Sequence, residues 1–337
     1  MSGSLVALGT YCGIFGALLA YCNFMQYGLT LAIVFSLSLL VLGYVIVFTG
    51  FCFMGRTLVR SPFEAPIAAI KLQLNICSTV VTYIRRGFKT RFPEWTLTFE
   101  ITGNMMRYMF EEFGEVIAFE NAALLREPFA MHGRLILKSN CRKHNTIPEK
   151  LEANGLEHWW LRDADKKQQR VVVIHFHGGG FAMSHPLQDV ELANQTHTML
   201  KQILKDKYQL DVSVDVLLAN YRKSPEHPYP APDDDCLTMY QYVLKHENIS
   251  SKHVLFSGDS AGAKMSLFNC IRMRDSKSEL PLGCLLYSPS VDFEEKGGDE
   301  KTPFCIMPAK FVDSVHQTYL ANVTDIEERL KVSPINH

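Results

Sequence analysis

The chain has 337 residues, of which 47% are hydrophobic and 20% are charged, and its formal net charge is −1. This length is enough for one large domain with an appendage. The near-neutral charge, without a basic patch interleaved with aromatic residues, argues against a nucleic-acid partner. The nine cysteines form no CxxC pair, so a disulfide framework is not expected.

The first 55 residues contain no Asp, Glu, Lys, Arg or His, and the first charged residue is Arg56. About 20 apolar residues of helix cross a bilayer core, so this stretch can hold two spans. We predict a transmembrane hairpin with spans Leu5 to Phe24 and Leu29 to Met54. A cleaved signal peptide, or a single long span with a buried extension, are the alternatives. The first segment lacks the charged region of a signal peptide.

The charges after the second span predict its orientation. Arg56, Arg60 and Lys71 follow it with only Glu64 against them. By the positive-inside rule the following domain then lies in the cytosol, at an endomembrane such as the endoplasmic reticulum. Three glycosylation sequons would suit a lumenal domain instead, at Asn194, Asn248 and Asn322.

Residues 56–155 form the second of three predicted regions, after the anchor at 1–55 and before 156–337. Apolar residues recur at helical spacing in Ile67–Ile76 and Phe99–Phe110, which predicts helices. Ordinary core helices would explain this pattern. A basic cluster at Arg85–Arg91 is either a solvated loop or a contact with anionic headgroups.

From residue 156 onward, strand-like and helix-like segments alternate. The expected strands are Leu156–Leu161, Arg170–His175, Val212–Ala219, His253–Phe256 and Leu282–Tyr287. The expected helices are Leu187–Lys205, Pro232–His246, Lys264–Arg274 and Pro308–Leu320. This alternation predicts an α/β fold with a mostly parallel sheet.

The first chemical motif is a glycine triplet that follows the strand at residues 170–175. It reads His177-Gly178-Gly179-Gly180, and adjacent glycines free the backbone to turn several N–H groups toward one point. Such a loop can form half of an oxyanion hole. A flexible loop, or a metal pair of His175 with His177, are the other interpretations. Because no further ligand stands nearby at metal-site spacing, we predict no metal.

The second motif is Gly258-Asp259-Ser260-Ala261-Gly262, between a strand and a helix. Small residues at Gly258 and Gly262 let strand and helix approach closely, with the serine exposed at the apex of the turn. The N–H of Ala261 then lies at the positive end of a helix, where it can stabilise an oxyanion. Such a pentapeptide arises by chance in roughly one chain in ten of this size, so the combination of motifs carries the argument.

A third run lies between the other two, from Asn220 to Asp233, and contains Tyr-Arg-x-x-Pro-Glu-His-Pro-x-Pro-Ala. The three motifs in this order resemble the hormone-sensitive-lipase family of α/β-hydrolases, which includes the arylacetamide deacetylases. The resemblance covers roughly residues 156–337 and implies an α/β-hydrolase fold. It implies Ser260 as nucleophile, Gly178, Gly179, Gly180 and Ala261 as oxyanion donors, and His177, Gly258, Asp259 and Gly262 as motif residues.

The resemblance also bears on the rest of the chain. It favours a helical cap over the serine for residues 56–155, whose Met- and Phe-rich character would suit a lipid substrate. Arylacetamide deacetylases carry one anchor and face the lumen, against the orientation predicted above. Ala263-Lys264 stands where relatives usually have Gly-Asn, and we expect this departure to alter helix packing more than chemistry.

The family's catalytic triad consists of a serine, an acidic residue and a histidine. The sequence shows a match for the serine but not for the other two. In this fold they follow the serine, on loops after later strands. His316 and His337 are the only histidines after Ser260, and neither matches the family's position. A serine without a base is a poor nucleophile at neutral pH. The resemblance therefore implies a C-terminally incomplete hydrolase region, as in a truncated isoform, an incomplete gene model or a degenerate family member.

Two functions remain open from the sequence. The first is a membrane-anchored serine ester hydrolase of the lipase, esterase or deacetylase type that cleaves esters of lipids or small acyl esters. The second is a non-catalytic, hydrolase-like membrane protein that binds lipid or a partner. The expected partners are an acyl-ester or lipid substrate and the bilayer. No cofactor is expected, because acyl transfer by serine needs none, and the oligomeric state is left open.

Overall fold

The computed structural model describes Gly16, residues 29–294 and residues 305–337, and divides the chain into two compact units, residues 1–74 and 75–337. The first unit contains helix α2 (Leu29–Gly55), a short 3-10 helix η1 (Pro62–Glu64) and the first half of α3 (Ala65–Arg85). Helix α2 carries no charged residue and ends directly before Arg56. Within this unit the Tyr44 hydroxyl donates to Gln73 Oε1 at 3.4 Å.

The predicted membrane hairpin is described only in part. Helix α2 covers the predicted second span, whereas the predicted first span lies almost wholly outside the described residues. Among the described residues, one helical segment is long and apolar enough to cross a bilayer, Pro62–Arg85, with a mean hydropathy of 1.4. The apolar segment Ser36–Cys52 within α2 is shorter. This finding concerns length and composition only, so the hairpin stays a prediction.

The second unit begins with helices. The remainder of α3 is followed by α4 (Leu97–Ala118) and α5 (Ala122–Lys143). Helix α4 is capped by Thr96, whose Oγ1 accepts a hydrogen bond from the Phe99 N–H at 3.1 Å. Both stretches with apolar residues at helical spacing, in α3 and in α4, are therefore helical, as the periodicity predicts.

A six-stranded sheet follows, with strand order β1-β2-β4-β3-β5-β6. The strands are β1 (Thr146–Ala153), β2 (Leu156–Asp163), β3 (Arg170–Phe176), β4 (Ser213–Ala219), β5 (Val254–Asp259) and β6 (Gly283–Tyr287). Strands β4, β3, β5 and β6 are parallel, whereas β2 pairs antiparallel with both β1 and β4. The sheet is thus mixed rather than mostly parallel at the β1 end.

Strand β1 lies inside the region that the sequence assigns to the helical cap. It joins β2 through Asn154 and Gly155, which both have positive φ, 52° and 70°. Two consecutive residues of this kind make the turn that best matches the twist of a hairpin. The hairpin places Pro148 on an edge strand, where its missing N–H is tolerated.

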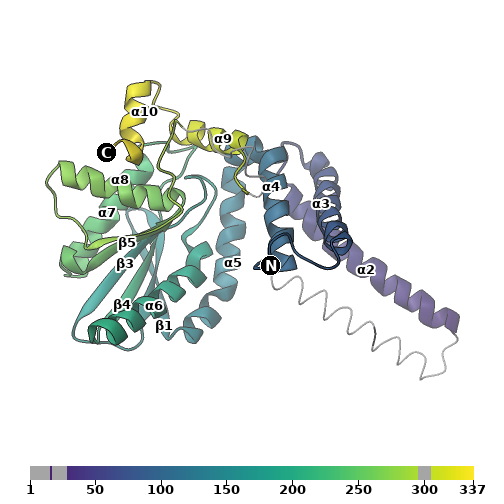
Figure 1. Cartoon of the computed structure of the whole chain (residues 1–337), viewed down its shortest axis with the longest axis horizontal. Coiled ribbons are helices and arrows are strands. Elements are labelled where there is room, and N and C mark those ends of the chain that lie inside the picture. The colour runs from purple at the N-terminus through teal and green to yellow at the C-terminus, as the bar shows by residue number, and fades with distance from the viewer. Residues whose placement is uncertain (1–15, 17–28, 295–304) are drawn as a thin grey trace. The chain divides into compact units, whose positions relative to one another are not determined.

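Helices cover both faces of the sheet (Figure 1). Helix α5 contacts β1 and α6 contacts β4, while α8 contacts β3, β5 and β6 with α7 beside it. The remaining helices are α6 (Val190–Tyr208), α7 (Ala231–His246), α8 (Ala261–Asp275), α9 (Ala309–Tyr319) and α10 (Ile326–Val332). Short 3-10 helices lie at η2 (Pro186–Asp189), η3 (Ser251–His253) and η4 (Pro334–Asn336).

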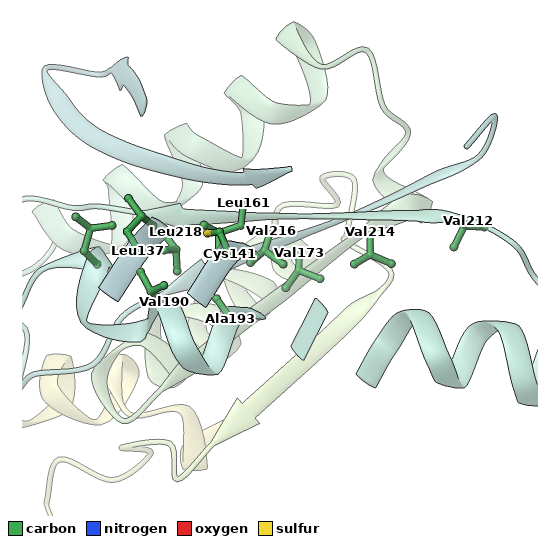
Figure 2. Close-up of a cluster of buried hydrophobic side chains, with 11 residues drawn as sticks. Leu137, Cys141, Leu161, Val173, Val190, Ala193, Val212, Val214, Val216 and Leu218 are labelled. Atoms are coloured by element: carbon green, nitrogen blue, oxygen red, sulfur yellow. The ribbon is translucent and has the colours of Figure 1, made fainter. Parts of the chain in front are cut away.

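A cluster of buried apolar side chains fills the space between the sheet and helices α5 and α6 (Figure 2). Alternate residues of β4, Val214, Val216 and Leu218, point toward it, as expected for a strand with a period of two. Leu137 and Cys141 of α5 and Val190 and Ala193 of α6 close it from the other side. This packing buries the face of the sheet that lies toward α5 and α6.

Leu218→Ala should lower the free energy of unfolding by about 2–5 kcal/mol, because the leucine is fully buried and its removal leaves a cavity. Leu210→Ala is the matched control, since Leu210 is 44% exposed, and it should cost less than about 1 kcal/mol. Urea unfolding of the two variants measures the difference, and equal losses would contradict the assigned core.

Candidate active site

Ser260 is the apex of a strained turn between β5 and α8. Its φ is 48° and its ψ is −112°, a conformation that residues other than glycine rarely adopt. Its N–H donates to Tyr287 O at 2.9 Å, and its carbonyl accepts from the Lys264 N–H at 3.0 Å, which starts the helix. The strand–turn–helix that the sequence predicts is therefore present, with the serine at its apex.

The glycines on either side of the serine are required by contact distances. A Cβ on Gly262 would lie 1.8 Å from the carbonyl oxygen of Phe176, at the end of β3. A Cβ on Gly258 would lie 2.5 Å from the carbonyl carbon of Gly262. No side chain fits at either position, so helix α8 can start directly against two neighbouring strands.

The glycine triplet provides N–H groups beside this turn. Gly179 and Gly180 have φ of 105° and 59°, and neither N–H has a hydrogen-bond partner within the described part of the chain. Ala261 is the first residue of α8, where backbone N–H groups lack partners in the helix. The sequence predicts Gly178 as a donor too, but its N–H donates to Asp259 Oδ1 at 2.7 Å. The groups free to bind an oxyanion are therefore those of Gly179, Gly180 and Ala261.

Asp259 belongs to a group of three polar side chains behind the turn. His175 Nε2 lies 3.1 Å from Asp189 Oδ2 and 3.9 Å from Asp259 Oδ1. Burial, together with the smaller effect of the nearby Asp189 charge, raises the pKa of Asp259 to about 6. One oxygen or nitrogen from each residue lies within 4.8 Å of the others, a set that could hold a cation. This set includes His175 but not His177, so it differs from the histidine pair considered from the sequence.

His177 supports the oxyanion loop from inside. It is fully buried, its Nδ1 lies 2.7 Å from Gly178 O, and its ring stacks on Tyr221 at a centroid distance of 4.4 Å. Burial holds the pKa of His177 well below its ordinary value, so the ring is neutral and Nδ1–H donates to the carbonyl. The Tyr221 hydroxyl donates to His177 O at 2.8 Å. The two residues fix the backbone that leads into the glycines.

Neither later histidine contacts the serine in the described structure. His316 Nε2 lies 3.5 Å from Ser290 Oγ, and its ring packs edge-on against Phe293. Burial lowers the pKa of His316 to about 4. His337 Nε2 bonds to Lys331 O instead. Among the described residues, no side chain forms a hydrogen bond with Ser260 Oγ, so the turn and the oxyanion groups are present without a base in contact.

One buried polar network near the site is not foreseen by the sequence. Lys264 Nζ donates to Asp233 Oδ1 at 2.9 Å and to the Tyr319 hydroxyl at 2.7 Å, and that hydroxyl donates to Asp233 Oδ2. All three side chains are fully buried. Tyr319 also stacks on Phe181, the residue after Gly180, at a centroid distance of 3.8 Å. The only sequence signal is Lys264 itself, the departure expected to alter helix packing.

Residues 173–337 match a protein family described as having the alpha/beta hydrolase fold. The chain is 29% identical over 143 residues to an acetyl-hydrolase of Streptomyces hygroscopicus, covering 42% of this chain and 43% of that protein. It is 31% identical over 121 residues to an esterase of Acinetobacter venetianus, covering 36% of each. The chain thus spans less than half the length of these curated relatives.

Two solved structures resemble the chain at 18% identity. The esterase LipW of Mycobacterium marinum gives a TM-score of 0.51, covering 62% of this chain and 65% of that one. A hyperthermophilic esterase from the archaeon Pyrobaculum calidifontis gives 0.50, covering 69% and 74%. Residues 173–337 therefore match an α/β-hydrolase family, and the chain shares the fold of these esterase structures. The relatives of the chain in sequence include esterases and acetyl-hydrolases.

Gly262→Ala should lower the free energy of unfolding by more than about 4 kcal/mol or prevent folding, because its Cβ would overlap Phe176 O. Gly103→Ala in α4 is the control, since a Cβ there meets nothing within 4 Å, and it should be neutral or stabilising by up to about 1 kcal/mol. Thermal and urea unfolding of both variants test this, and a stable Gly262→Ala protein would rule out the close approach.

Asp259 should make stability depend on pH. Its folded pKa of about 6 lies above the ordinary 3.8, so its contribution is fully present below about pH 4 and is lost as the pH rises through about 6. Asp259→Asn removes this titration but keeps an oxygen for the Gly178 N–H. As the pH rises from 4 to 7.5, the wild-type protein should therefore lose unfolding free energy relative to Asp259→Asn. A constant difference would contradict the raised pKa.

Proposed function

We propose that this chain is a membrane-anchored serine ester hydrolase of the hormone-sensitive-lipase type. The observation that carries the proposal is the strained conformation of Ser260 beside three backbone N–H groups that have no partner in the described ranges, those of Gly179, Gly180 and Ala261. An arrangement of this kind serves acyl transfer.

The geometry supports a definite division of labour among these residues. Ser260 Oγ attacks the ester carbonyl, and the N–H groups of Gly179, Gly180 and Ala261 stabilise the negative oxygen of the tetrahedral intermediate. Collapse of the intermediate breaks the ester C–O bond, and the leaving alkoxide takes up the proton that Ser260 Oγ gives up and departs as the alcohol. Water then hydrolyses the acyl-serine, which releases the acid and restores the serine hydroxyl. Asp259 and His177 do not touch the substrate, and they hold the oxyanion loop through Gly178.

Membrane attachment is part of the proposal. It is supported by the uncharged first 55 residues and by the apolar segment Pro62–Arg85. The cytosolic side of an endomembrane is the proposed location of residues 75–337, from the basic residues that follow α2. The proposed substrates are esters of lipids or small acyl esters, in keeping with the esterase relatives.

A second function is favoured by one observation, that no side chain of the described residues bonds to Ser260 Oγ. A hydroxyl without a base has no acceptor for its proton in the transition state. A non-catalytic, hydrolase-like membrane protein that binds lipid or a partner would need no such acceptor.

Labelling by a fluorophosphonate probe separates the two functions, because the probe reacts with an activated serine whatever the substrate. The hydrolase proposal predicts labelling of the folded 337-residue chain and its loss in Ser260→Ala. Gel fluorescence measures it, with heat-unfolded protein and Ser290→Ala as controls. No labelling of a chain shown to be folded would overturn the proposal for this chain and favour the non-catalytic function.

A further inference from the structure

Helices α3 and α4 enclose a polar groove of about 310 Å³ within the second unit. On the α3 side it is lined by Asn75, Ser78, Thr79, Thr82 and Arg86. These positions recur every three or four residues, so they form one polar stripe on an otherwise apolar helix. Asn104 of α4 donates to Thr79 Oγ1 at 3.2 Å and joins the two helices. The basic cluster at residues 85–91 begins where this stripe ends.

Arg86 has an unused donor in the groove. Its Nη2 donates to Glu100 Oε1 at 2.7 Å, and the buried Glu100 also accepts from the Arg91 N–H at 3.1 Å. Arg86 Nη1 is buried and has no hydrogen-bond partner among the residues that the structure describes. A buried guanidinium N–H without an acceptor costs free energy, so its presence points to an acceptor that binds there.

The charge around this donor favours an anion. Residues 85–91 contain Arg85, Arg86, Lys89 and Arg91 and no acidic residue. Arg91 and, from α4, Arg107 also line the groove, against the acidic Glu100 and Glu111. Because Glu100 is already shared by Arg86 and the Arg91 backbone, the groove retains positive charge. Guanidinium groups bind phosphate oxygens with particularly good geometry.

Exposed apolar side chains lie next to the polar stripe. On α3, Val81 is 46% exposed and lies to one side of the stripe, whereas Ile84, 49% exposed, lies on the opposite face of the helix. Phe88 in the following loop is 68% exposed, and Phe99 at the start of α4 is 57% exposed. A free phosphate ion would make no use of these surfaces, whereas acyl chains would cover them.

We propose that this groove binds the phosphate of an anionic phospholipid, with Arg86 Nη1 as the central donor and the acyl chains along Val81, Phe88 and Phe99. The site is separate from Ser260 and does not depend on hydrolysis. It would hold the second unit against an anionic membrane surface.

The test uses the full chain carrying Ser260→Ala in a nonionic detergent, titrated with dioctanoyl phosphatidic acid and read out by native mass spectrometry. Arg86→Gln should weaken binding on the order of ten- to a hundredfold, the effect of losing a charged hydrogen bond. Arg85→Gln is the matched control, because it removes the same charge from the neighbouring position, which does not line the groove, and it should leave binding unchanged.

Ser78→Tyr provides an independent variant, since it fills the groove without touching the Arg86–Glu100 pair, and it should weaken binding to a similar extent. If circular dichroism shows that Arg86→Gln does not fold, the lipid binding of Ser78→Tyr tests the proposal instead. Equal losses in Arg85→Gln and Arg86→Gln would reduce the effect to surface charge and overturn the proposal. Equal affinity for inorganic phosphate would overturn a lipid ligand, and equal affinity for dioctanoylglycerol would overturn the phosphate contact.

Discussion

The contact between Gly262 and the carbonyl oxygen of Phe176 is the constraint on which the site depends. It lets the first turn of α8 lie directly on the ends of β3 and β5, two strands that pair in register from Val172 with Val254 to Phe176 with Gly258. The residues that follow β3 are the glycine triplet, and those that follow β5 are the serine turn. Parallel pairing with this register therefore brings the two halves of the oxyanion hole together without further contacts.

The buried pair of Lys264 and Asp233 connects α8 to other elements beside the site. A pair taken out of water does not by itself add much stability, because desolvation offsets the attraction. Its bonds to Tyr319 nevertheless connect α8, α7 and α9, and Tyr319 stacks on Phe181 at the end of the glycine loop. We therefore interpret the lysine as a determinant of how α9 packs beside the site, in line with the altered helix packing expected from Lys264.

The sequence predicts the boundaries of those strands and helices that have one buried face or that are followed by a glycine-rich turn. Strands β3, β4 and β5 and helices α6 and α7 begin and end within a few residues of the predicted ranges. Strand β1 is not predicted from the sequence, because its apolar residues are few and only Asn154 and Gly155 mark the hairpin. The group of His175, Asp189 and Asp259 is not predicted for another reason. Its members are spread over 85 positions of the sequence, and they come together only through the register of β3 and β5 and through the helix η2.

The two proposed functions differ in whether a group accepts the hydroxyl proton of Ser260. The structure limits which side chains could be that acceptor. Asp259 is the adjacent carboxyl, but its Oδ1 accepts from Gly178, and burial favours its protonated form. His316 is neutral over most of the pH range, because its pKa is lowered to about 4, yet its Nε2 is directed at Ser290. A neutral imidazole of such low basicity is a weak general base even when it is in reach. Activation of Ser260 therefore requires an acceptor other than the titratable groups that surround it in the described part of the chain.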